Sequence, residues 1–263
     1  MAAPIRIGTC SWADESLTRY FYPPGVKGAE ERLRYYAERF DTVEANSTYY
    51  RLPDEEMVRR WHERTPEGFV MHVKAFGVMT RHPVKLEQLP PYVVFKPASL
   101  EYLEWAQEQL GGDEMLVEFR HASWLDEENR LETLAFLERN HMSYVIVDAP
   151  RTQARNVSPT VVATTTPTAY VRYHGRNAET WNKRVRSAAE RFDYLYSEDE
   201  LGEWVEPLAE LSGQADNVYA MFNNNGRSET PRGDIAQAPV NAQMLRGLLE
   251  SKGLPVTPAP ASA

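Results

Sequence analysis

Three features that the sequence lacks narrow the class of protein it encodes. Cys10 is the only cysteine among the 263 residues, which excludes an internal disulfide framework and favours a reducing compartment. The chain has no apolar run of about 18 residues, the length that a membrane-spanning helix needs. A strand-like run starts at Ile5, which leaves no room for a signal peptide. We therefore expect a cytoplasmic protein with no membrane partner.

Positive charge is also scarce. The formal net charge of −9 argues against a protein that coats nucleic acid, because such proteins need basic surfaces to displace counterions. One local cluster of basic residues lies within residues 174–191, and its members are Arg176, Lys183, Arg184, Arg186 and Arg191. The cluster indicates either a solvated helix face or an anion-binding loop, so nucleic acid is a disfavoured partner but not an excluded one.

Nucleotide-binding fingerprints are missing as well. No Gly-x-Gly-x-x-Gly follows a strand-like run and no phosphate-binding loop motif occurs, which weakens the case for a nucleotide-binding fold. The composition itself, 42% hydrophobic and 25% charged, is typical of a globular domain. A chain of this length is long enough to bury a sizeable core.

Strand-like runs alternate with amphipathic segments along most of the chain. The strand-like runs cover residues 5–12, 42–50, 69–76, 115–120, 144–148, 169–174 and 218–223. The helical segments cover residues 30–40, 54–64, 99–110, 126–140 and 241–251, with another helix after Ser197. This alternation predicts an α/β fold in which helices wrap a parallel sheet. Seven or eight such units in about 250 residues fit a closed TIM-like (β/α)8 barrel better than an open sheet.

Capping residues mark where three of the helices begin. Asp54 and Ser99 are the expected N-cap residues of their helices. Ser197 opens a capping box that Glu200 completes. We assign residues 1–252 to a single barrel domain, and residues 253–263, rich in proline and alanine, to a disordered tail.

Polar residues end most of the strand-like runs, often in pairs spaced two apart. Side chains alternate faces along a strand, so residues two apart point the same way. If the strands are parallel neighbours, the polar groups at their carboxyl ends converge, and this end is where sites of α/β proteins lie. The candidates found in this way are Glu44, Asn46, Lys74, Glu118, Arg120, Asp148, Arg172, His174, Asn223 and Asn224.

Four of the candidates have the chemistry of acids and bases. Glu44 and Glu118 form a carboxylate pair whose separated pKa values would let one donate a proton while the other stays ionised. The alternative is that each glutamate pairs with an arginine, as Arg120 beside Glu118 suggests, and only ties strand ends together. His174 is either a proton shuttle or a hydrogen-bonded histidine at a strand end. Asp148 is the fourth catalytic candidate.

The remaining candidates are suited to holding a polar or anionic ligand. Lysine offers a point charge and arginine a planar fork for phosphate or carboxylate, while asparagine orients a ligand by hydrogen bonds. A tyrosine ring stacks on a sugar or base, or else caps the core. The substrate-binding candidates are Asn46, Tyr49, Lys74, Arg120, Arg172, Asn223 and Asn224.

We predict no cofactor. The six histidines show no His-x-His or His-Glu-x-x-His spacing of the kind that binds zinc. A single divalent ion held by Glu44, Glu118 and Asp148 stays open as a weaker alternative.

Several motifs, in a fixed order, resemble those of a known family. They are Ile-Gly-Thr-Cys-Ser-Trp at residues 7–12, Phe-Tyr-Pro-Pro-Gly at 21–25, Thr-Val-Glu-Ala-Asn-Ser-Thr-Tyr-Tyr-Arg-Leu-Pro at 42–53, Val-Glu-Phe-Arg-His-Ala-Ser-Trp at 117–124, Tyr-Val-Arg-Tyr-His-Gly-Arg at 170–176 and Val-Tyr-Ala-Met-Phe-Asn-Asn at 218–224. From residue 5 to about residue 249 the chain resembles the domain-of-unknown-function 72 (DUF72), or YecE-like, family. The resemblance implies a TIM-like barrel of uncharacterised function. It also implies a packing role for Cys10, where similar members carry small residues.

The chain departs from the family pattern at residues 77–95. Similar members have, after the third strand, a long loop or helix and then an apolar strand that ends in a Phe-Gln-x-Pro-Pro-like turn. Only Glu-Gln-Leu-Pro-Pro at residues 87–91 survives here. A strand-helix unit of roughly 30 residues is therefore missing, and we predict an irregular segment and a compromised fourth strand.

The leading functional hypothesis is a hydrolase of a polar anionic substrate, such as a phosphodiester or a sugar phosphate. A glycosidase-like hydrolase acting on neutral sugar is one alternative, in which the arginines only tune the carboxylates. A non-catalytic barrel that binds a ligand or nucleic acid is another. A final alternative is that the missing unit has abolished the activity of this particular chain.

Overall fold

The computed structural model describes residues 2–77, 79, 93–152, 154–181, 183, 185 and 188–258. Seven strands form one sheet in spatial order β3-β2-β1-β7-β6-β5-β4, and each neighbouring pair is parallel. The strands are β1 (Ile5–Thr9), β2 (Thr42–Ala45), β3 (Val70–Val73), β4 (Leu116–Val117), β5 (Ser143–Asp148), β6 (Thr168–Tyr173) and β7 (Asn217–Phe222). The predicted α/β class is confirmed.

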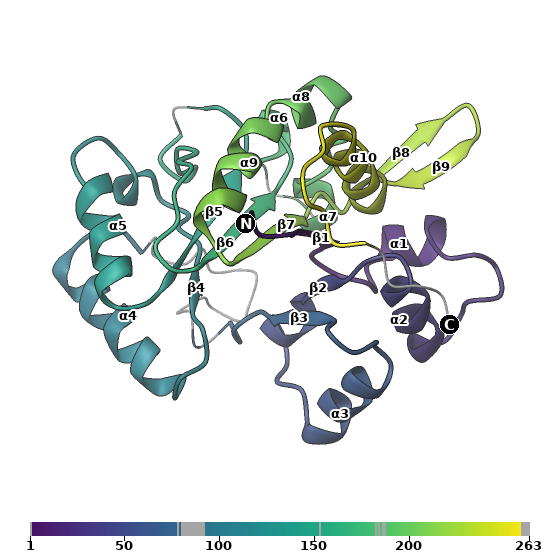
Figure 1. The fold of residues 1–263 in the computed structure, drawn as a ribbon, viewed down its shortest axis with the longest axis horizontal. Helices are drawn as coiled ribbons and strands as arrows, with labels where there is room; N and C mark the ends of the chain where they lie inside the picture. The colour runs from purple at the N-terminus through teal and green to yellow at the C-terminus, as the bar shows by residue number, and fades with distance from the viewer. Residues whose placement is uncertain are drawn as a thin grey trace.

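Helices connect the strands and surround the sheet (Figure 1). They are α1 (Glu15–Tyr20), α2 (Ala29–Ala37), α3 (Glu55–Glu63), α4 (Pro97–Gln109), α5 (Arg130–Arg139), α6 (Ala178–Trp181), α7 (Ala188–Arg191), α8 (Glu198–Gly202), α9 (Val205–Gln214) and α10 (Gln237–Ser251). Two 3-10 helices, η1 (Asn46–Tyr49) and η2 (Ala122–Trp124), follow β2 and β4. No helix of the described part has the length and apolar character needed to cross a membrane.

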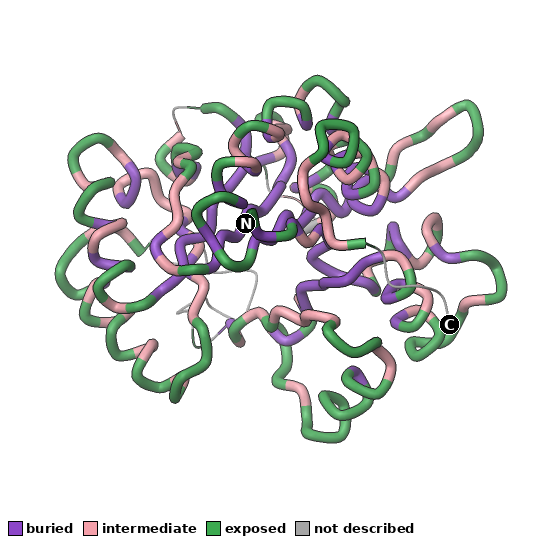
Figure 2. The backbone as a smooth tube through the Cα atoms, viewed as in Figure 1, coloured by how far each residue is buried: buried purple, intermediate pink, exposed green. Residues whose placement is uncertain are grey.

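The two faces of the sheet have different surroundings. On the outer face, Ile7, Ile146 and Val171 pack with helix residues such as Leu208 and Leu245 in the main hydrophobic core. The inner face has its own smaller core of buried residues, which are Cys10, Val145, Val147, Ala149, Val157, Tyr170, Trp181, Phe192, Tyr219 and Met221. Figure 2 shows the central strands buried, whereas β3 at the edge is mostly half-buried. The sheet thus separates two packed layers.

Contacts between distant strands show that the sheet is curled. In a flat sheet the three strand spacings between β2 and β6 would amount to about 14 Å. Yet Arg172 on β6 places Nη2 only 2.9 Å from Oε1 of Glu44 on β2. The His72 ring on β3 likewise packs against Tyr170 of β6 and Tyr219 of β7, with centroid distances of 4.8 and 4.4 Å. The inner face is therefore concave, and its side chains meet across it.

Local capping explains where the predicted helices begin. Asp54 caps α3 by accepting a hydrogen bond from the Met57 N–H, and Ser197 forms a capping box with Glu200 at α8, so both predictions are confirmed. The prediction for Ser99 is wrong, because α4 already begins at Pro97. Proline suits the first helical position, where its fixed φ fits and its missing N–H would have had no partner.

The predicted disordered tail is corrected in part. The Ile5 N–H donates to the Pro255 carbonyl at 2.7 Å, and the Thr257 N–H donates to the Ile5 carbonyl at 3.0 Å. The start of β1 is free for this pairing because β2 pairs with β1 only at Thr9 and Val43. Residues 254–257 therefore extend the sheet at its amino end, and residues 259–263 lie outside the described residues.

The predicted irregular segment is described only at its ends. After β3, Gly77 donates its N–H to the Tyr49 carbonyl at 2.9 Å. Residues 93–96 form no strand, and the Val93 carbonyl accepts a hydrogen bond from the Trp124 indole at 2.7 Å. The chain then enters α4 directly. Of the candidate fourth strand at residues 92–95, the described residues 93–95 are not in a strand. Residues 78 and 80–92 lie outside the described residues.

Candidate functional site

A buried ion cluster occupies the carboxyl end of the concave face. Arg172 of β6 lies between Glu44 of β2 and Glu118, which follows β4: Nη2 binds Glu44 at 2.9 Å and Nη1 binds Glu118. His174 and Asn223 continue the cluster at the ends of β6 and β7. We call these five residues the inner cluster. One arginine thus links carboxylates from the two halves of the curled sheet.

Glu44 is held ionised in the interior. Its Oε2 accepts a hydrogen bond from the Tyr170 hydroxyl at 2.9 Å, and the Cys10 thiol lies 3.7 Å away. Burial alone raises the pKa of Glu44, but the charges of Arg172 and Lys74 outweigh it and bring the pKa below its ordinary value. Burial raises the pKa of Cys10, so the thiol stays protonated and packs as an apolar group.

Glu118 has still more cationic partners. Oε1 lies 2.5 Å from Nε of Arg120, and Oε2 accepts from His174 Nε2 at 3.1 Å as well as from Arg172. Burial works to raise the pKa of Glu118, but the charges of Arg120 and Arg172 and the histidine overcome it and hold the pKa well below its ordinary value. Both carboxylates of the inner cluster are therefore negatively charged at neutral pH.

His174 is neutral at neutral pH. It is fully buried, and burial lowers its pKa to about 4 against the opposing charge of Glu118, with Arg120 and Arg172 adding to the decrease. The Asn223 amide group then donates to Nδ1 at 2.8 Å, and Nε2 donates to Glu118. The Phe192 ring stacks on the imidazole with a centroid distance of 5.0 Å. This environment fixes one tautomer of the ring.

Two cations lie between the inner cluster and solvent. The side chain of Arg120 is 39% exposed, and Lys74 is partly exposed with Nζ 4.9 Å from the ring centre of Tyr49. Burial lowers the pKa of Lys74, aided by Arg172 and opposed by Glu44 and Glu118. Three cations thus face the two carboxylates of the inner cluster, one positive charge more than these carboxylates balance, in a chain whose net charge is −9.

The structure brings most of the predicted site residues together. Glu44, Lys74, Glu118, Arg120, Arg172, His174 and Asn223 interact in one group, and the Tyr49 ring borders it. Asn46 lies at the start of η1, where its amide nitrogen donates to the Cys10 carbonyl. Glu118 pairs with Arg120 and Arg172, and Glu44 pairs with Arg172, so the ion pairs that the arginine alternative predicts are present. Whether the glutamates also take part in chemistry stays a prediction.

Two predicted site residues lie elsewhere. Asp148 is in register with Tyr173 rather than with Arg172, so it points to the outer face, where Arg176, Tyr196 and Trp204 bind it. Asn224 donates to Asn241 and to the Tyr194 carbonyl, also away from the inner cluster. These placements correct the expectation that every polar strand end converges.

The structure also limits where a metal ion would be held. Asp148 is on the opposite face from Glu44 and Glu118, so these three carboxylates do not converge on one ion. The described residues contain no group of three or more histidine, cysteine, aspartate or glutamate side chains suited to a metal.

The described members of the basic cluster at residues 174–191 have different partners. Arg176 joins the outer carboxylates, and Arg191 donates to the Trp181 carbonyl. Lys183 is exposed, whereas Arg184 and Arg186 lie outside the described residues. An anion-binding role for this loop therefore stays a prediction.

Asp14 is a candidate that the sequence analysis did not identify. It precedes α1, yet its carboxylate makes no cap hydrogen bond and instead interacts with Ser11 and with the charge of Lys74. Burial raises the pKa of Asp14 to about 6, despite both partners. An aspartate directly before a helix is typical of an N-cap, so the sequence offered no signal of another role.

Comparison with known proteins identifies the family. The model of the family described as "Protein of unknown function DUF72" matches residues 6–87 and 83–263. The two matched segments meet within residues 77–95, where the sequence predicts a missing unit. The UPF0759 protein YunF of Bacillus subtilis (strain 168) is 28% identical over 256 residues, covering 84% of this chain and 89% of that protein. The UPF0759 protein YecE of Escherichia coli (strain K12) is 40% identical over 53 residues, 20% of either chain.

Solved structures agree with this result. A DUF72 family protein from Thermotoga maritima MSB8 is 31% identical with a TM-score of 0.74, covering 94% of this chain and 99% of that chain. A DUF72 family protein from Enterococcus faecalis V583 shares the fold with a TM-score of 0.77 at 24% identity, covering 94% of this chain and 95% of that chain. The chain belongs to the DUF72 family of proteins of unknown function.

Proposed function

We propose that the chain is a hydrolase that binds a phosphodiester or a sugar phosphate at the inner cluster. The observation that carries the proposal is the excess cation at the carboxyl end of the concave face. Glu44 and Glu118 bind both terminal nitrogens of Arg172, whereas Lys74 and Arg120 are accessible. A phosphate group placed between these two side chains neutralises the excess charge.

Binding of an anion prepares Glu118 for chemistry. When Arg120 turns its guanidinium to the phosphate, Glu118 loses one of its two bound arginines, and its pKa rises toward the ordinary value. Glu118 then accepts a proton from the water that attacks phosphorus, while the neutral His174 keeps the carboxylate oriented. A new P–O bond to water forms as the bond to the leaving oxygen breaks.

Asp14 is the proton donor in this scheme. The leaving oxygen needs a proton, and neither Glu44 nor Glu118 carries one at neutral pH. Burial raises the pKa of Asp14 to about 6, so part of it is protonated near neutrality. Lys74 interacts with the charges of both Asp14 and Glu118, which places it between the acid and the base.

The glycosidase-like alternative has weaker support. A glycosidic bond must lie between the two catalytic carboxyl groups. Here the guanidinium of Arg172 fills that space, because it binds Glu44 and Glu118 with its two terminal nitrogens. The arrangement favours a substrate approaching from the side of Lys74 and Arg120.

We also propose that the curled sheet is an incomplete TIM-like barrel. Its support is the parallel order of the strands, the packed concave face and the contacts of β2 and β3 with β6 and β7 across it. The carboxyl end of such a barrel is the face on which sites lie.

Hydrolysis of bis(4-nitrophenyl) phosphate and 4-nitrophenyl phosphate tests the proposal. We expect slow hydrolysis by the wild type and a loss of about 10²- to 10⁴-fold in Glu118→Gln, because general-base catalysis contributes a factor of that size. Glu108→Gln, which changes an exposed glutamate of α4, is the matched control. A Glu118→Gln variant that hydrolyses either compound at the wild-type rate contradicts the assignment. Phosphate binding without hydrolysis supports the non-catalytic alternative.

A further inference from the structure

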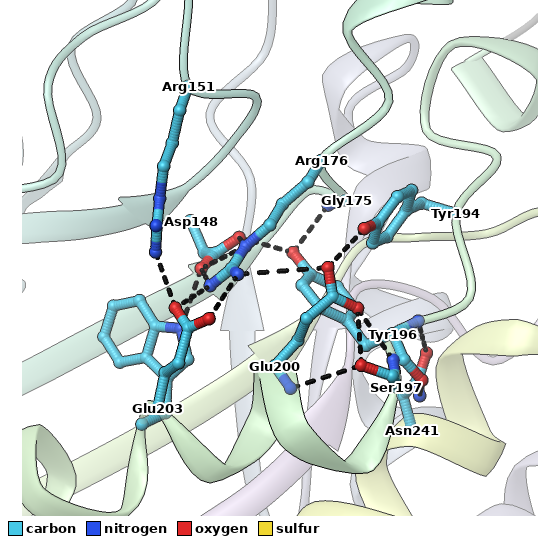
Figure 3. A network of polar contacts seen from close by, with 11 residues as sticks. Asp148, Arg151, Gly175, Arg176, Tyr194, Tyr196, Ser197, Glu200, Glu203 and Asn241 are labelled. Atoms are coloured by element: carbon cyan, nitrogen blue, oxygen red, sulfur yellow. Dashed lines mark hydrogen bonds and ion pairs between the residues drawn. The ribbon is translucent and has the colours of Figure 1, made fainter.

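A second polar network lies on the outer face of the sheet, beside the inner cluster (Figure 3). Its centre is Asp148 at the end of β5, and the Asp148 residue is 3% exposed. Oδ1 accepts from Arg176 Nε at 3.0 Å and from the Tyr196 hydroxyl at 2.8 Å. Oδ2 accepts from Arg176 Nη2 and from the Trp204 indole, both at 2.7 Å. Both carboxylate oxygens are thus fully used, which leaves no acceptor for a substrate.

The two strongest partners of Asp148 are the ends of one loop. Arg176 follows β6 directly, and Tyr196 precedes α8, so the carboxylate ties together residues twenty positions apart in the sequence. Arg176 is held further by Glu203, the C-cap residue of α8, with Nη2 3.1 Å from Oε2. Residues 176 and 196 therefore have one common anchor in β5.

The same network sets the direction of the chain at the inner cluster. The His174 N–H donates to the Asp148 carbonyl at 2.9 Å. The next residue, Gly175, donates its N–H to the Tyr196 hydroxyl at 2.8 Å and has a φ of 86°. A Cβ there would lie 2.5 Å from Cβ of Tyr194. Only glycine fits this turn, which redirects the chain immediately after His174.

The anchored loop supplies the aromatic cover of the inner cluster. Phe192 stacks on His174, and Trp181 lies 6.1 Å from the same ring. The Arg120 guanidinium lies over both, at 5.7 Å from the Trp181 ring centre and 5.8 Å from that of Phe192. These rings exclude water from one side of His174, and they hold the guanidinium of the partly exposed Arg120 by cation–π contacts.

We propose that Asp148 is a positioning residue, whose carboxylate clamps residues 176 and 196 and thereby holds Phe192 and Trp181 over His174 and Arg120. The inference rests on the proposed function only in taking His174 and Arg120 as parts of the site. The hydroxyl of Tyr196 is the link that joins Asp148 to the main chain next to His174.

A matched pair of tyrosine variants tests the clamp without an activity assay. Tyr196→Phe removes the hydroxyl that joins Asp148 to Gly175. Tyr194→Phe removes a hydroxyl from the same loop that binds Glu200 instead. Ring ¹⁵N spectra of histidine-labelled protein between pH 4 and 8 report the tautomer and pKa of His174, with His174→Gln providing the assignment.

The clamp predicts different results for the two variants. In wild type and Tyr194→Phe, the His174 ring keeps one tautomer at pH 7 and titrates near pH 4. In Tyr196→Phe, we expect the loosened loop to admit water, the pKa to rise by one unit or more toward 6.5, and the ring to populate both tautomers. Unchanged His174 signals in a folded Tyr196→Phe variant would overturn the proposal, even if thermal stability falls. Loss of phosphoester hydrolysis in any variant does not bear on this result.

Discussion

Two arginines four residues apart in the chain bind carboxylates on opposite faces of the sheet. Arg172 lies on the concave face between Glu44 and Glu118, and Arg176 lies on the outer face between Asp148 and Glu203. Both guanidinium groups are largely buried. β6 ends at Tyr173, and Arg176 follows the turn at Gly175, so strand alternation does not place it on the face of Arg172. Each arginine belongs to a separate network.

The two networks differ in whether the charged group at the centre is fully hydrogen-bonded. In the outer network both oxygens of Asp148 have at least two donors each. In the inner cluster, Arg172 Nε and the nearby Asn46 Oδ1 are buried without a hydrogen-bond partner in the described structure. With the flanking Lys74 and Arg120, three cations face the two carboxylates of the cluster. A satisfied network fixes one geometry, whereas an unsatisfied one with excess charge leaves capacity for a ligand. We therefore assign a structural role to the outer network and a ligand-binding role to the inner cluster.

The largest expected difference concerns stability. Asp148→Asn removes the charge that compensates Arg176 and turns an amide N–H₂ toward donors, so we expect the free energy of unfolding to fall by about 3–5 kcal/mol. Glu118→Gln should cost about half as much, because Glu118 is partly exposed and Arg120 can turn to solvent. Urea unfolding of both variants measures this difference. A Glu118→Gln variant that is less stable than Asp148→Asn would reverse the assignment of the two networks.

The next effect is a pH dependence that comes from the inner face. The pKa values of His174 and His72 are lowered by burial from 6.5 to about 4. The unfolded chain takes up these protons below pH 6.5 and the folded protein does not, so stability falls as the pH decreases from 6.5 toward 4. Each histidine contributes about 2 kcal/mol to this decrease.

His174→Gln should therefore flatten the dependence by about half between pH 6.5 and 4.5, as measured by urea unfolding at a series of pH values. The window ends at 4.5 because Glu44 and Glu118, whose folded pKa values are lowered, begin to cost stability below it. His141→Gln, which changes an exposed histidine, is the control. An equal slope in all three proteins would show that His174 is not held neutral.

The smallest effect has the opposite sign and concerns Asp14. Its folded pKa is raised from 3.8 to about 6, so its contribution to stability is full below pH 3.8 and is lost as the pH rises through 6. Asp14→Asn should therefore stabilise the protein at pH 8 by about 1–2 kcal/mol, after allowance for solvent screening, and by little near pH 4. Thermal unfolding at the two pH values measures the gain. An equal change at both would contradict the raised pKa.

The sequence predicts the features of this molecule that depend on neighbouring residues, and it misses those that depend on pairing between distant segments. The two-residue spacing correctly predicted that Glu44, Glu118, Arg172 and His174 share a face, because alternation along a strand is local. It gave the wrong face for Asp148, since the relative register of β5 and β6 depends on long-range pairing.

Other features needed three-dimensional context as well. The sequence shows an aspartate before a helix at residue 14, but only the fold brings Lys74, the residue after β3, near it. The sequence does not reveal the pairing of residues 254–257 with β1, because that pairing uses the part of β1 that β2 leaves unpaired. The β8 (Arg227–Thr230) and β9 (Gly233–Ala236) hairpin has short, polar strands that the hydrophobic pattern does not reveal.

Binding of inorganic phosphate is the most direct test of the claim that the inner cluster holds an anion. A ligand that binds only the folded protein raises the thermal midpoint with its concentration. We expect phosphate to raise the midpoint of the wild type and of Lys252→Met, an exposed control, more than chloride at equal ionic strength, and to have no such effect on Lys74→Met. A phosphate-dependent rise of the same size in Lys74→Met, or none in the wild type, would contradict the account.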